Sequence, residues 1–192
     1  TTNPGKRAEL IQLLEGFPLE IHTPDQISLN LDVEEIGASY AENARLKAHA
    51  FCQAAQMPVI ADDTGLEVFA LDGSPGLHSA RYLAAPDASD ADRRKKLIQD
   101  LNPFPRPWLA RFVCSVALAL PDGEIHESFG ECHGEIIPQE RGENGFGYDR
   151  IFLFPDLQQT MAELPMEIKN QISHRARAIQ ALQPTLARLT LA

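Results

Sequence analysis

Four segments of the chain have the pattern of an amphipathic helix. They are a segment that begins at Pro4 and ends at Gly16, residues 39–55, residues 87–101, and a last segment that begins near Ser173. In the first, leucines recur every three or four residues, the period of one helical face. Asn3 is a typical N-cap, and Pro4 suits the first helical position because no amide hydrogen is required there.

Apolar runs predict the strands, at residues 57–61, 108–120, 124–137 and 151–154. The second and third of these runs flank the turn Pro121-Asp122-Gly123, so they predict an antiparallel hairpin. Residues 62–65, Asp-Asp-Thr-Gly, interrupt the first run, and an apolar pattern resumes over 66–71. Helices and strands are mixed and no internal repeat is visible, so the fold class that we predict is α/β.

The composition is that of a folded, water-soluble protein. A length of 192 residues allows one generous domain or two small lobes. With 44% hydrophobic and 23% charged residues, the chain is close to the globular average and does not resemble a disordered or collagen-like sequence. The longest apolar run, residues 112–120, is broken by Ser115 and is well short of the roughly 20 residues that a membrane-spanning helix needs.

The formal charge of −10 argues against a protein that binds nucleic acid over its whole surface, because phosphate contacts need clustered Lys and Arg. A small anionic ligand would instead need a local positive pocket or a bound divalent cation. Cys52, Cys114 and Cys132 form no C-x-x-C pair, which favours a reducing compartment without disulfides. No charged-then-apolar leader opens the sequence, so we expect a cytoplasmic protein.

Lys6 is the first candidate for a chemical role. A cation in the first turn of a helix opposes the positive end of the helix dipole, and an anion would relieve this. The loop of Thr, Asn, Pro and Gly before it is a reasonable phosphate cradle, although an N-cap followed by an exposed lysine explains the same residues. It is not a Walker A loop, because Arg7 stands where that motif has Ser or Thr.

Asp62 and Asp63 are the second candidate. Two ionised carboxylates at the end of an apolar strand repel each other unless a cation or hydrogen-bond donors lie between them. Bound Mg²⁺ would satisfy this need, and one carboxylate could then deprotonate the attacking water. A solvated turn is the ordinary alternative.

Three further clusters contain polar or aromatic residues with possible binding roles. Glu34 precedes the second helix, on which Asn43 and Lys47 face the same way. The segment from Asn144 to Asp149 places an aromatic ring between two glycines, where a base could stack. Lys169 and the run Ser173-His174-Arg175 offer donors at the start of the last helix. Surface charge, an unremarkable turn and exposed first-turn residues are the respective alternatives.

Together and in this order, the motifs resemble those of the inosine triphosphate pyrophosphatase family, the house-cleaning XTP/dITP diphosphatases, over nearly the whole chain. The matching motifs are T-x-N-x-x-K at residues 1–6, E-x-x-G at 34–37, E-N-A-x-x-K at 42–47, A-D-D-[ST]-G-L at 61–66, P-G-x-x-S-A-R-Y at 75–82, F-G-Y-D at 146–149, T-x-A-E-L at 160–164 and K-x-x-x-S-H-R at 169–175.

The resemblance implies Mg²⁺-dependent hydrolysis of ITP, dITP or XTP to the monophosphate and pyrophosphate. By position, Asp63 would be the general base for water that attacks the α-phosphorus, and Glu34, Asp62 and Asp63 would form the Mg²⁺ site. The residues implied in substrate binding are Thr1, Thr2, Asn3, Pro4, Gly5, Lys6, Lys47, Thr64, Phe146, Gly147, Tyr148, Asp149, Lys169, His174 and Arg175. Donors aimed at a 6-oxo group would reject the 6-amino group of adenine.

The same resemblance implies a single elongated α/β domain over residues 1–192, whose mixed sheet spans two lobes with the nucleotide between them, and a homodimer. Two positions depart from the family pattern. Thr2 replaces a small glycine, and Arg150 stands where the family has proline, either as a charge near the base pocket or as a surface residue.

Two alternatives to this function remain at the level of sequence. The Maf-like pyrophosphatases, which act on pyrimidine triphosphates, open with S-x-S-x-x-R, whereas this chain has Thr1, Asn3 and Lys6. From a different class, the chain could be a catalytically weak nucleotide-binding protein.

Overall fold

The structure is a computed structural model and describes residues 3–85 and 87–189. The helices are α1 (Pro4–Leu14), α2 (Tyr40–Ala55), α3 (Asp90–Leu101), α4 (Met166–Ile172) and α5 (His174–Leu189). The strands are β1 (Val59–Val68), β2 (Pro75–Gly76), β3 (Trp108–Ala119), β4 (Ile125–Ile136), β5 (Phe152–Phe154) and β6 (Gln159–Thr160). Short 3-10 turns cover Phe69–Leu71, Ser79–Arg81 and Asp149–Ile151.

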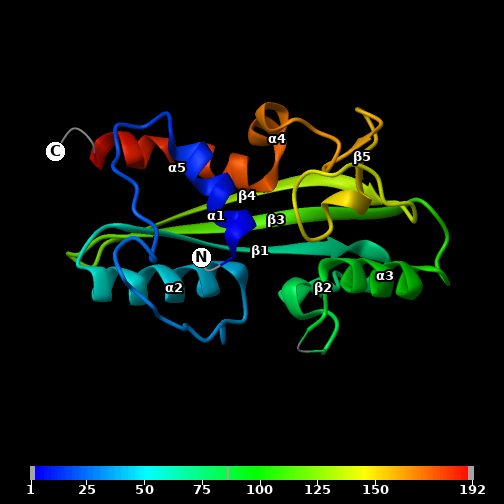
Figure 1. Cartoon of the computed structure of the whole chain (residues 1–192), viewed down its shortest axis with the longest axis horizontal. Helices are drawn as coiled ribbons and strands as arrows, with labels where there is room; N and C mark the ends of the chain where they lie inside the picture. Colours follow the sequence, from blue (N-terminus) through cyan, green and yellow to red (C-terminus); the bar gives the residue numbers. More distant parts are fainter. Residues whose placement is uncertain (1–2, 86, 190–192) are drawn as a thin grey trace. The chain divides into compact units, whose positions relative to one another are not determined.

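Within the described residues the strands form one sheet in the order β2-β1-β3-β4-β5-β6, and helices flank it (Figure 1). Strand β2 pairs with β1, and β5 with both β4 and β6, in antiparallel register. In the β4/β5 pair, Glu135 lies opposite Leu153 and Ile136 opposite Phe152. This architecture confirms the predicted α/β class with flanking helices.

The described chain divides into two compact units. The first unit comprises the described parts of Thr1–Asp63, Cys114–Gly130 and His174–Ala192, and the second comprises those of Thr64–Val113 and Glu131–Ser173. Strands β1, β3 and β4 therefore each contribute residues to both units. Separate hydrophobic clusters stabilise the two units, as apolar area is removed from water in each.

In the first unit, α2 covers one face of the strands, and α1 and α5 cover the other (Figure 1). The alternation of side chains along β3 explains this division, because successive residues of a strand point to opposite faces. Val116 and Leu118 pack with the leucines of α1 and α5, whereas Ala117 and Ala119 pack against the alanines of α2.

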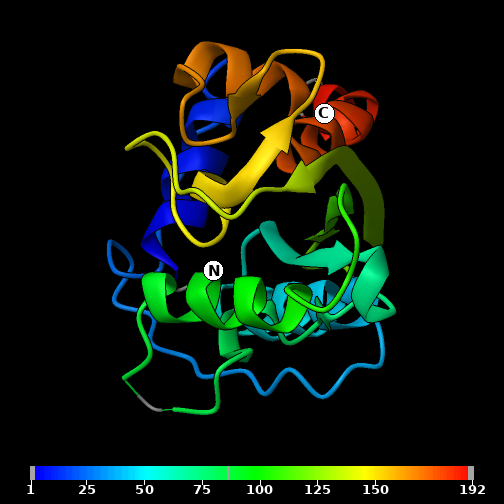
Figure 2. The same ribbon diagram turned by 90° about the vertical axis from the view of Figure 1, so that its right-hand side faces the viewer.

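In the second unit, α3 lies alongside the strands (Figure 2), and one hydrophobic cluster contains residues of both. Leu97 and Leu101 of α3 pack with Trp108, Ala110 and Phe112 of β3 in this cluster. Leu109, which points to the opposite face of β3, is 50% exposed. Burial thus follows the period of two that the strand imposes.

Most predicted elements are confirmed. The two-residue strands β2 and β6 were not predicted, and three larger differences concern β1, α3 and α4. Strand β1 runs without a break through residues 62–65, where the sequence predicted an interruption. Buried carboxylates are tolerated in a strand when they are paired with cations and hydrogen-bonded, as Asp62 and Asp63 are. Helix α3 begins at Asp90, three residues later than predicted, because Ser89 and Asp92 form a capping box there. Helix α4 was not predicted, and it directly precedes α5.

Candidate active site

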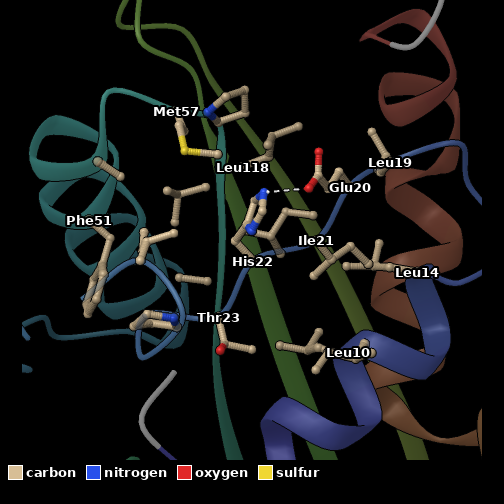
Figure 3. A pocket seen from close by; sticks show the side chains of 18 of the residues that line it. Leu10, Leu14, Leu19, Glu20, Ile21, His22, Thr23, Phe51, Met57 and Leu118 are labelled. Carbon is tan, nitrogen blue, oxygen red and sulfur yellow. Dashed lines mark ion pairs between the residues drawn. The ribbon is translucent and has the colours of Figure 1, made fainter. Parts of the chain in front are cut away.

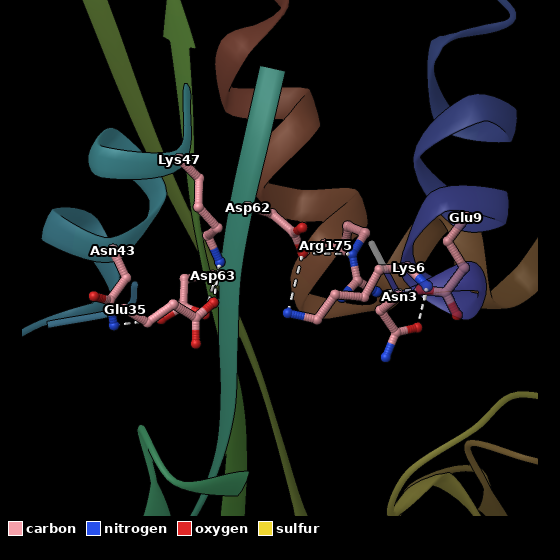
Figure 4. Close-up of polar contacts among 9 residues, drawn as sticks. All are labelled: Asn3, Lys6, Glu9, Glu35, Asn43, Lys47, Asp62, Asp63 and Arg175. Carbon is pink, nitrogen blue, oxygen red and sulfur yellow. Dashed lines mark hydrogen bonds and ion pairs between the residues drawn. The ribbon is translucent and has the colours of Figure 1, made fainter. Parts of the chain in front are cut away.

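Strand β1 directs its two consecutive aspartates to opposite faces (Figure 4). Ile60 packs in the cluster with α1 and α5, and Ala61 in the cluster with α2. The same alternation sends Asp62 towards α1 and α5, and Asp63 towards α2. The two carboxylates therefore have different partners and do not form one shared site.

Asp62 belongs to a buried group of four alternating charges. Its Oδ2 accepts a hydrogen bond from Nε of Arg175 at 3.2 Å and lies 3.8 Å from Nζ of Lys6. The guanidinium of Arg175 also donates to Glu9 through Nη1. Asp62 and Arg175 are 0% and 1% exposed. Burial alone would raise the pKa of Asp62, but Lys6 and Arg175 hold that pKa well below its usual range.

Asp63 forms a second polar group, with the side chains of α2. Nδ2 of Asn43 donates to its Oδ2 at 3.2 Å, and Nζ of Lys47 lies 3.3 Å from its Oδ1. Lys47 also contacts Oε1 of Glu35 at 2.7 Å. Burial raises the pKa of Asp63, although Lys47 acts in the opposite direction. A carboxylate with a raised pKa is a better proton acceptor for catalysis near neutral pH.

The loop before α2 is fixed by capping interactions. Ser39 accepts a hydrogen bond from the N–H of Glu42 at 3.2 Å, as an N-cap. The N–H of Gly37 donates to Oδ1 of Asn43 at 2.8 Å, so Asn43 is oriented with its amide nitrogen towards Asp63. A Cβ at Gly37 would lie 2.7 Å from that same Oδ1, which explains why the approach requires glycine.

The structure brings Glu35, rather than Glu34, to this group. Glu34 is exposed, whereas Glu35 contacts Lys47 beside Asp63. The three residues expected to hold Mg²⁺, Glu34, Asp62 and Asp63, are thus not brought together. Neighbouring residues of an extended loop point in different directions, so the sequence could not distinguish one glutamate from the other. Among the described residues, no group of three or more acidic, histidine or cysteine side chains forms a metal site.

The start of α1 has the predicted capping. Oδ1 of Asn3 accepts from the N–H of Lys6 at 3.1 Å, and Pro4 occupies the first turn. Gly5 follows it in the first turn, and the ammonium of Lys6 faces Asp62. Thr1 and Thr2 lie outside the described residues, so their expected roles stay predictions.

The aromatic segment forms a distinct polar group in the second unit, together with α4. We call residues 145–149 the base loop. Nζ of Lys169 contacts Oδ2 of Asp149 at 2.7 Å and lies 5.6 Å from the centre of the Phe146 ring. The N–H of Phe146 donates to the same carboxylate at 3.1 Å. Lys169 is only 2% exposed, which makes this a buried ion pair beneath an aromatic ring.

Tyr148 and Gly147, two further residues of the predicted base-binding segment, also lie in the second unit. The hydroxyl of Tyr148 donates to the carbonyl of Ser79 at 2.9 Å. Gly147 has a positive φ of 59°, and a Cβ there would meet nothing within 4 Å. Thr64 opens the second unit on β1 and is half-buried. The side chain of Arg150 is 42% exposed, and its guanidinium lies 3.9 Å from a carboxylate oxygen of Glu140.

The predicted donors of the last motif are divided between the units. Lys169 belongs to the second unit, and His174 and Arg175 belong to the first. His174 is buried at the start of α5, where Gly130 of β4 allows close packing, because a Cβ at Gly130 would lie 2.3 Å from the carbonyl of His174. The sequence analysis missed Glu9 as a partner of Arg175. Its position one helical turn after Lys6 was the available signal, since residues three apart share a helix face.

The first unit also contains an apolar cavity of about 360 Å³ between α1, α2, β1 and α5 (Figure 3). Leu10, Leu14, Ile21 and Leu118 are among the side chains that line it. Its polar contacts include an ion pair between His22 and Glu20 at 3.3 Å. An apolar lining does not suit a triphosphate, so the cavity is not the predicted nucleotide site.

None of the helices that the structure describes has both the length and the apolar character of a membrane span.

The fold and these polar groups define an α/β protein in which one buried strand carries a separate charged group on each face. The model of the Ham1 family matches residues 1–185, and the chain belongs to this family. It is 43% identical to a dITP/XTP pyrophosphatase of Listeria monocytogenes serotype 4b (strain F2365), over 97% of this chain and 92% of the relative. It is 41% identical to a dITP/XTP pyrophosphatase of Geobacter sulfurreducens, over 97% of this chain and 94% of the relative.

Solved structures agree with this assignment. The Ham1 protein of Staphylococcus aureus superposes with a TM-score of 0.84 at 43% identity, covering 98% of this chain and 96% of that one. A HAM1 protein of Coxiella burnetii superposes with a TM-score of 0.85 at 37% identity, covering 100% and 96%.

Proposed function

We propose that this protein hydrolyses deaminated purine nucleoside triphosphates, namely ITP, dITP and XTP, to the monophosphate and pyrophosphate. The observation that carries the proposal is the environment of Asp63. This carboxylate is buried, has a raised pKa, and is oriented by Asn43 and Lys47. A fixed carboxylate of this kind suits a general base that deprotonates water. The curated relatives named as dITP/XTP pyrophosphatases support the same reaction.

In this proposal, the first unit binds the triphosphate. The N-terminus of α1 offers the positive end of the helix dipole, with Asn3 as the N-cap and Pro4, Gly5 and Lys6 in the first turn. Thr1 and Thr2 would extend this cradle. Lys47, which already bridges two carboxylates, would neutralise a further phosphate oxygen.

Glu35 and Asp63 fit a magnesium ion better than the set expected from the sequence. Both offer carboxylate oxygens, the ligands that Mg²⁺ prefers, and both converge on one cation, the ammonium of Lys47. Asp62 is fully buried and its Oδ2 is already held by Arg175 and Lys6. Bound Mg²⁺ would supply Lewis-acid stabilisation of negative charge on the phosphates. We therefore propose Glu35 and Asp63 as its protein ligands.

The second unit would recognise the base. The ring of Phe146 offers a stacking surface, and Gly147 and Tyr148 follow it in the base loop. Lys169, fixed by Asp149, would donate towards a 6-oxo group, and His174 and Arg175 would contact the base or the phosphates. A site that donates to an oxo group leaves its donors unpaired when the base carries an amino group, so adenine would be disfavoured. Thr64 would complete the substrate-binding set.

The first experiment is pyrophosphate release from ITP, XTP, GTP, ATP and dTTP, each with and without Mg²⁺. Fast, Mg²⁺-dependent release from ITP and XTP alone is the expected result. A preference for dTTP would support the Maf-like alternative. Nucleotide binding without release from any substrate would instead identify a catalytically weak binding protein.

We also propose that the protein is a cytoplasmic homodimer. Light scattering coupled to size-exclusion chromatography gives the molar mass in solution, and a value close to the monomer mass of 21.2 kDa would refute the dimer.

A further inference from the structure

Helix α3 holds both backbone polar groups of Gly147 in the base loop. The N–H of Gly147 donates to Oδ2 of Asp90 at 2.7 Å, and its carbonyl accepts from Nη1 of Arg94, also at 2.7 Å. Asp90 and Arg94 are four residues apart, so they lie on one face of the helix. Both hydrogen bonds involve a charged group, which makes them stronger than bonds between neutral partners. The loop can neither shift nor rotate at Gly147 without losing at least one of them.

Arg94 is itself fixed by a third residue. Its Nε and Nη2 donate to the two carboxylate oxygens of Glu140 at 2.8 Å and 2.9 Å, a bidentate pair. This fork leaves Nη1 directed at the carbonyl of Gly147, and Arg94 is only 6% exposed. A lysine could form one of these contacts but not the planar set of three. Arg94 is therefore held in one position, and its hydrogen bond fixes the carbonyl of Gly147 in the base loop.

Gly147 has open space where a side chain would project. A Cβ built on it would meet nothing within 4 Å, whereas a Cβ on Gly145 would lie 2.0 Å from Oδ2 of Asp149. The fixed peptide of Gly147 thus borders open space at its own Cα. Recognition of a base edge depends on polar groups held within a fraction of an ångström, because a displacement of about 1 Å can cost two orders of magnitude in rate.

We propose that Asp90 and Arg94 are positioning residues for base selectivity, which fix the Gly147 peptide of the base loop from α3. This inference rests on the proposed function and extends it to residues outside the base loop. Asp90 and Arg94 act through Gly147 and need not touch the nucleotide. Glu140 acts through Arg94. The selectivity for a 6-oxo base would then depend on a helix whose sequence contains no nucleotide-binding motif.

The test uses two substrates, ITP and ribose 5-triphosphate, which has the triphosphate but no base. For Arg94→Lys and Asp90→Asn we expect kcat/KM for ITP to fall about 10-fold to 100-fold, since each change weakens a hydrogen bond to a charged group. The kcat/KM for ribose 5-triphosphate should stay within about two-fold of the wild-type value. The ratio of kcat/KM for ITP to kcat/KM for ATP should fall. Affinity for the product IMP, measured by calorimetry, should fall by a similar factor.

Arg111→Lys is the matched control, because Arg111 forms ion pairs with Glu67 and Glu131 in the same unit, and neither glutamate belongs to the base loop. This variant should leave kcat/KM unchanged for both substrates. Should Arg94→Lys fail to fold, Glu140→Gln provides a milder change at a side chain that is 37% exposed, with an expected loss smaller than that of Arg94→Lys.

Equal losses for the two substrates would overturn the inference, because they would indicate a general structural role. An unchanged value for ITP would overturn it as well. If the wild type itself shows no preference for ITP over ATP, the proposed function fails first, and a selectivity role fails with it. These outcomes separate the two proposals.

Discussion

Removing the charge of Arg175 should destabilise the protein strongly. The guanidinium is 1% exposed and lies between the carboxylates of Asp62 and Glu9, which are 0% and 3% exposed. With Lys6, the group contains two positive and two negative charges. Arg175→Met would leave two buried carboxylates with a single cation. Breaking a buried ion pair by removing one partner typically costs about 3–5 kcal/mol, because the remaining charge is left uncompensated.

This loss is measurable by urea unfolding followed by circular dichroism. Because m is typically about 1–3 kcal/mol/M in urea, the midpoint should fall by roughly 2 M at an unchanged m value. Arg188→Met is the control. Arg188 is exposed near the end of α5, where its guanidinium donates to the hydroxyl of Thr185, so we expect a change within about 0.5 kcal/mol.

A double-mutant cycle tests the physical cause. Glu9→Gln removes one of the two carboxylates, so the double variant Arg175→Met/Glu9→Gln should be more stable than the sum of the two single losses predicts. Coupled neighbours typically show interaction energies of about 0.5–3 kcal/mol. Additive losses, or an Arg175→Met variant within about 1 kcal/mol of the wild type, would refute the view that charge balance stabilises this group.

Three other changes test the site directly. Asp63→Asn should lower kcat for ITP by at least about two orders of magnitude while ITP still binds, measured by stopped assays and calorimetry, and a near wild-type rate would remove Asp63 as the general base. Glu35→Gln should raise the Mg²⁺ concentration at half-maximal activity several-fold and Glu34→Gln should not, so equal effects would contradict the assignment of Glu35. Gly145→Ala should lower the melting temperature, because its φ is +74° and the new Cβ would lie 2.0 Å from a carboxylate oxygen of Asp149, and an unchanged melting temperature would show that the loop is not tightly packed.

The charge distribution reconciles an acidic protein with an anionic ligand. The formal charge is −10, yet Lys6, Lys47, Lys169 and Arg175 are all buried or nearly buried. Each is held by at least one carboxylate, which offsets part of the cost of taking the cation out of water. Cations can therefore be held in the interior of each unit of a protein whose net charge would repel polyanions such as nucleic acids.

Local patterns determined much of what the sequence could predict. The cap at Asn3 with Pro4 behind it, the long hairpin of β3 and β4, and the bounds of α2 all depend on residues close together in the chain. Caps, turns and side-chain periods depend on interactions over a few residues, so they can be predicted without a structure. The ordered motifs, read together, also predicted the family to which the chain belongs.

Only the tertiary structure decided how the charged residues are paired. Asp62 meets Arg175 across 113 positions of sequence, and Asp63 meets Lys47 across 16. The sequence predicted that both aspartates interrupt the strand and share a metal site. Instead, the strand continues through them and directs their side chains to opposite faces. The contact of Lys47 with Glu35 rather than Glu34 likewise depends on which surfaces pack together, and so does the hydrogen bond between α3 and Gly147. Such pairings follow from long-range packing, in which a single step along a strand or loop reverses the direction of a side chain.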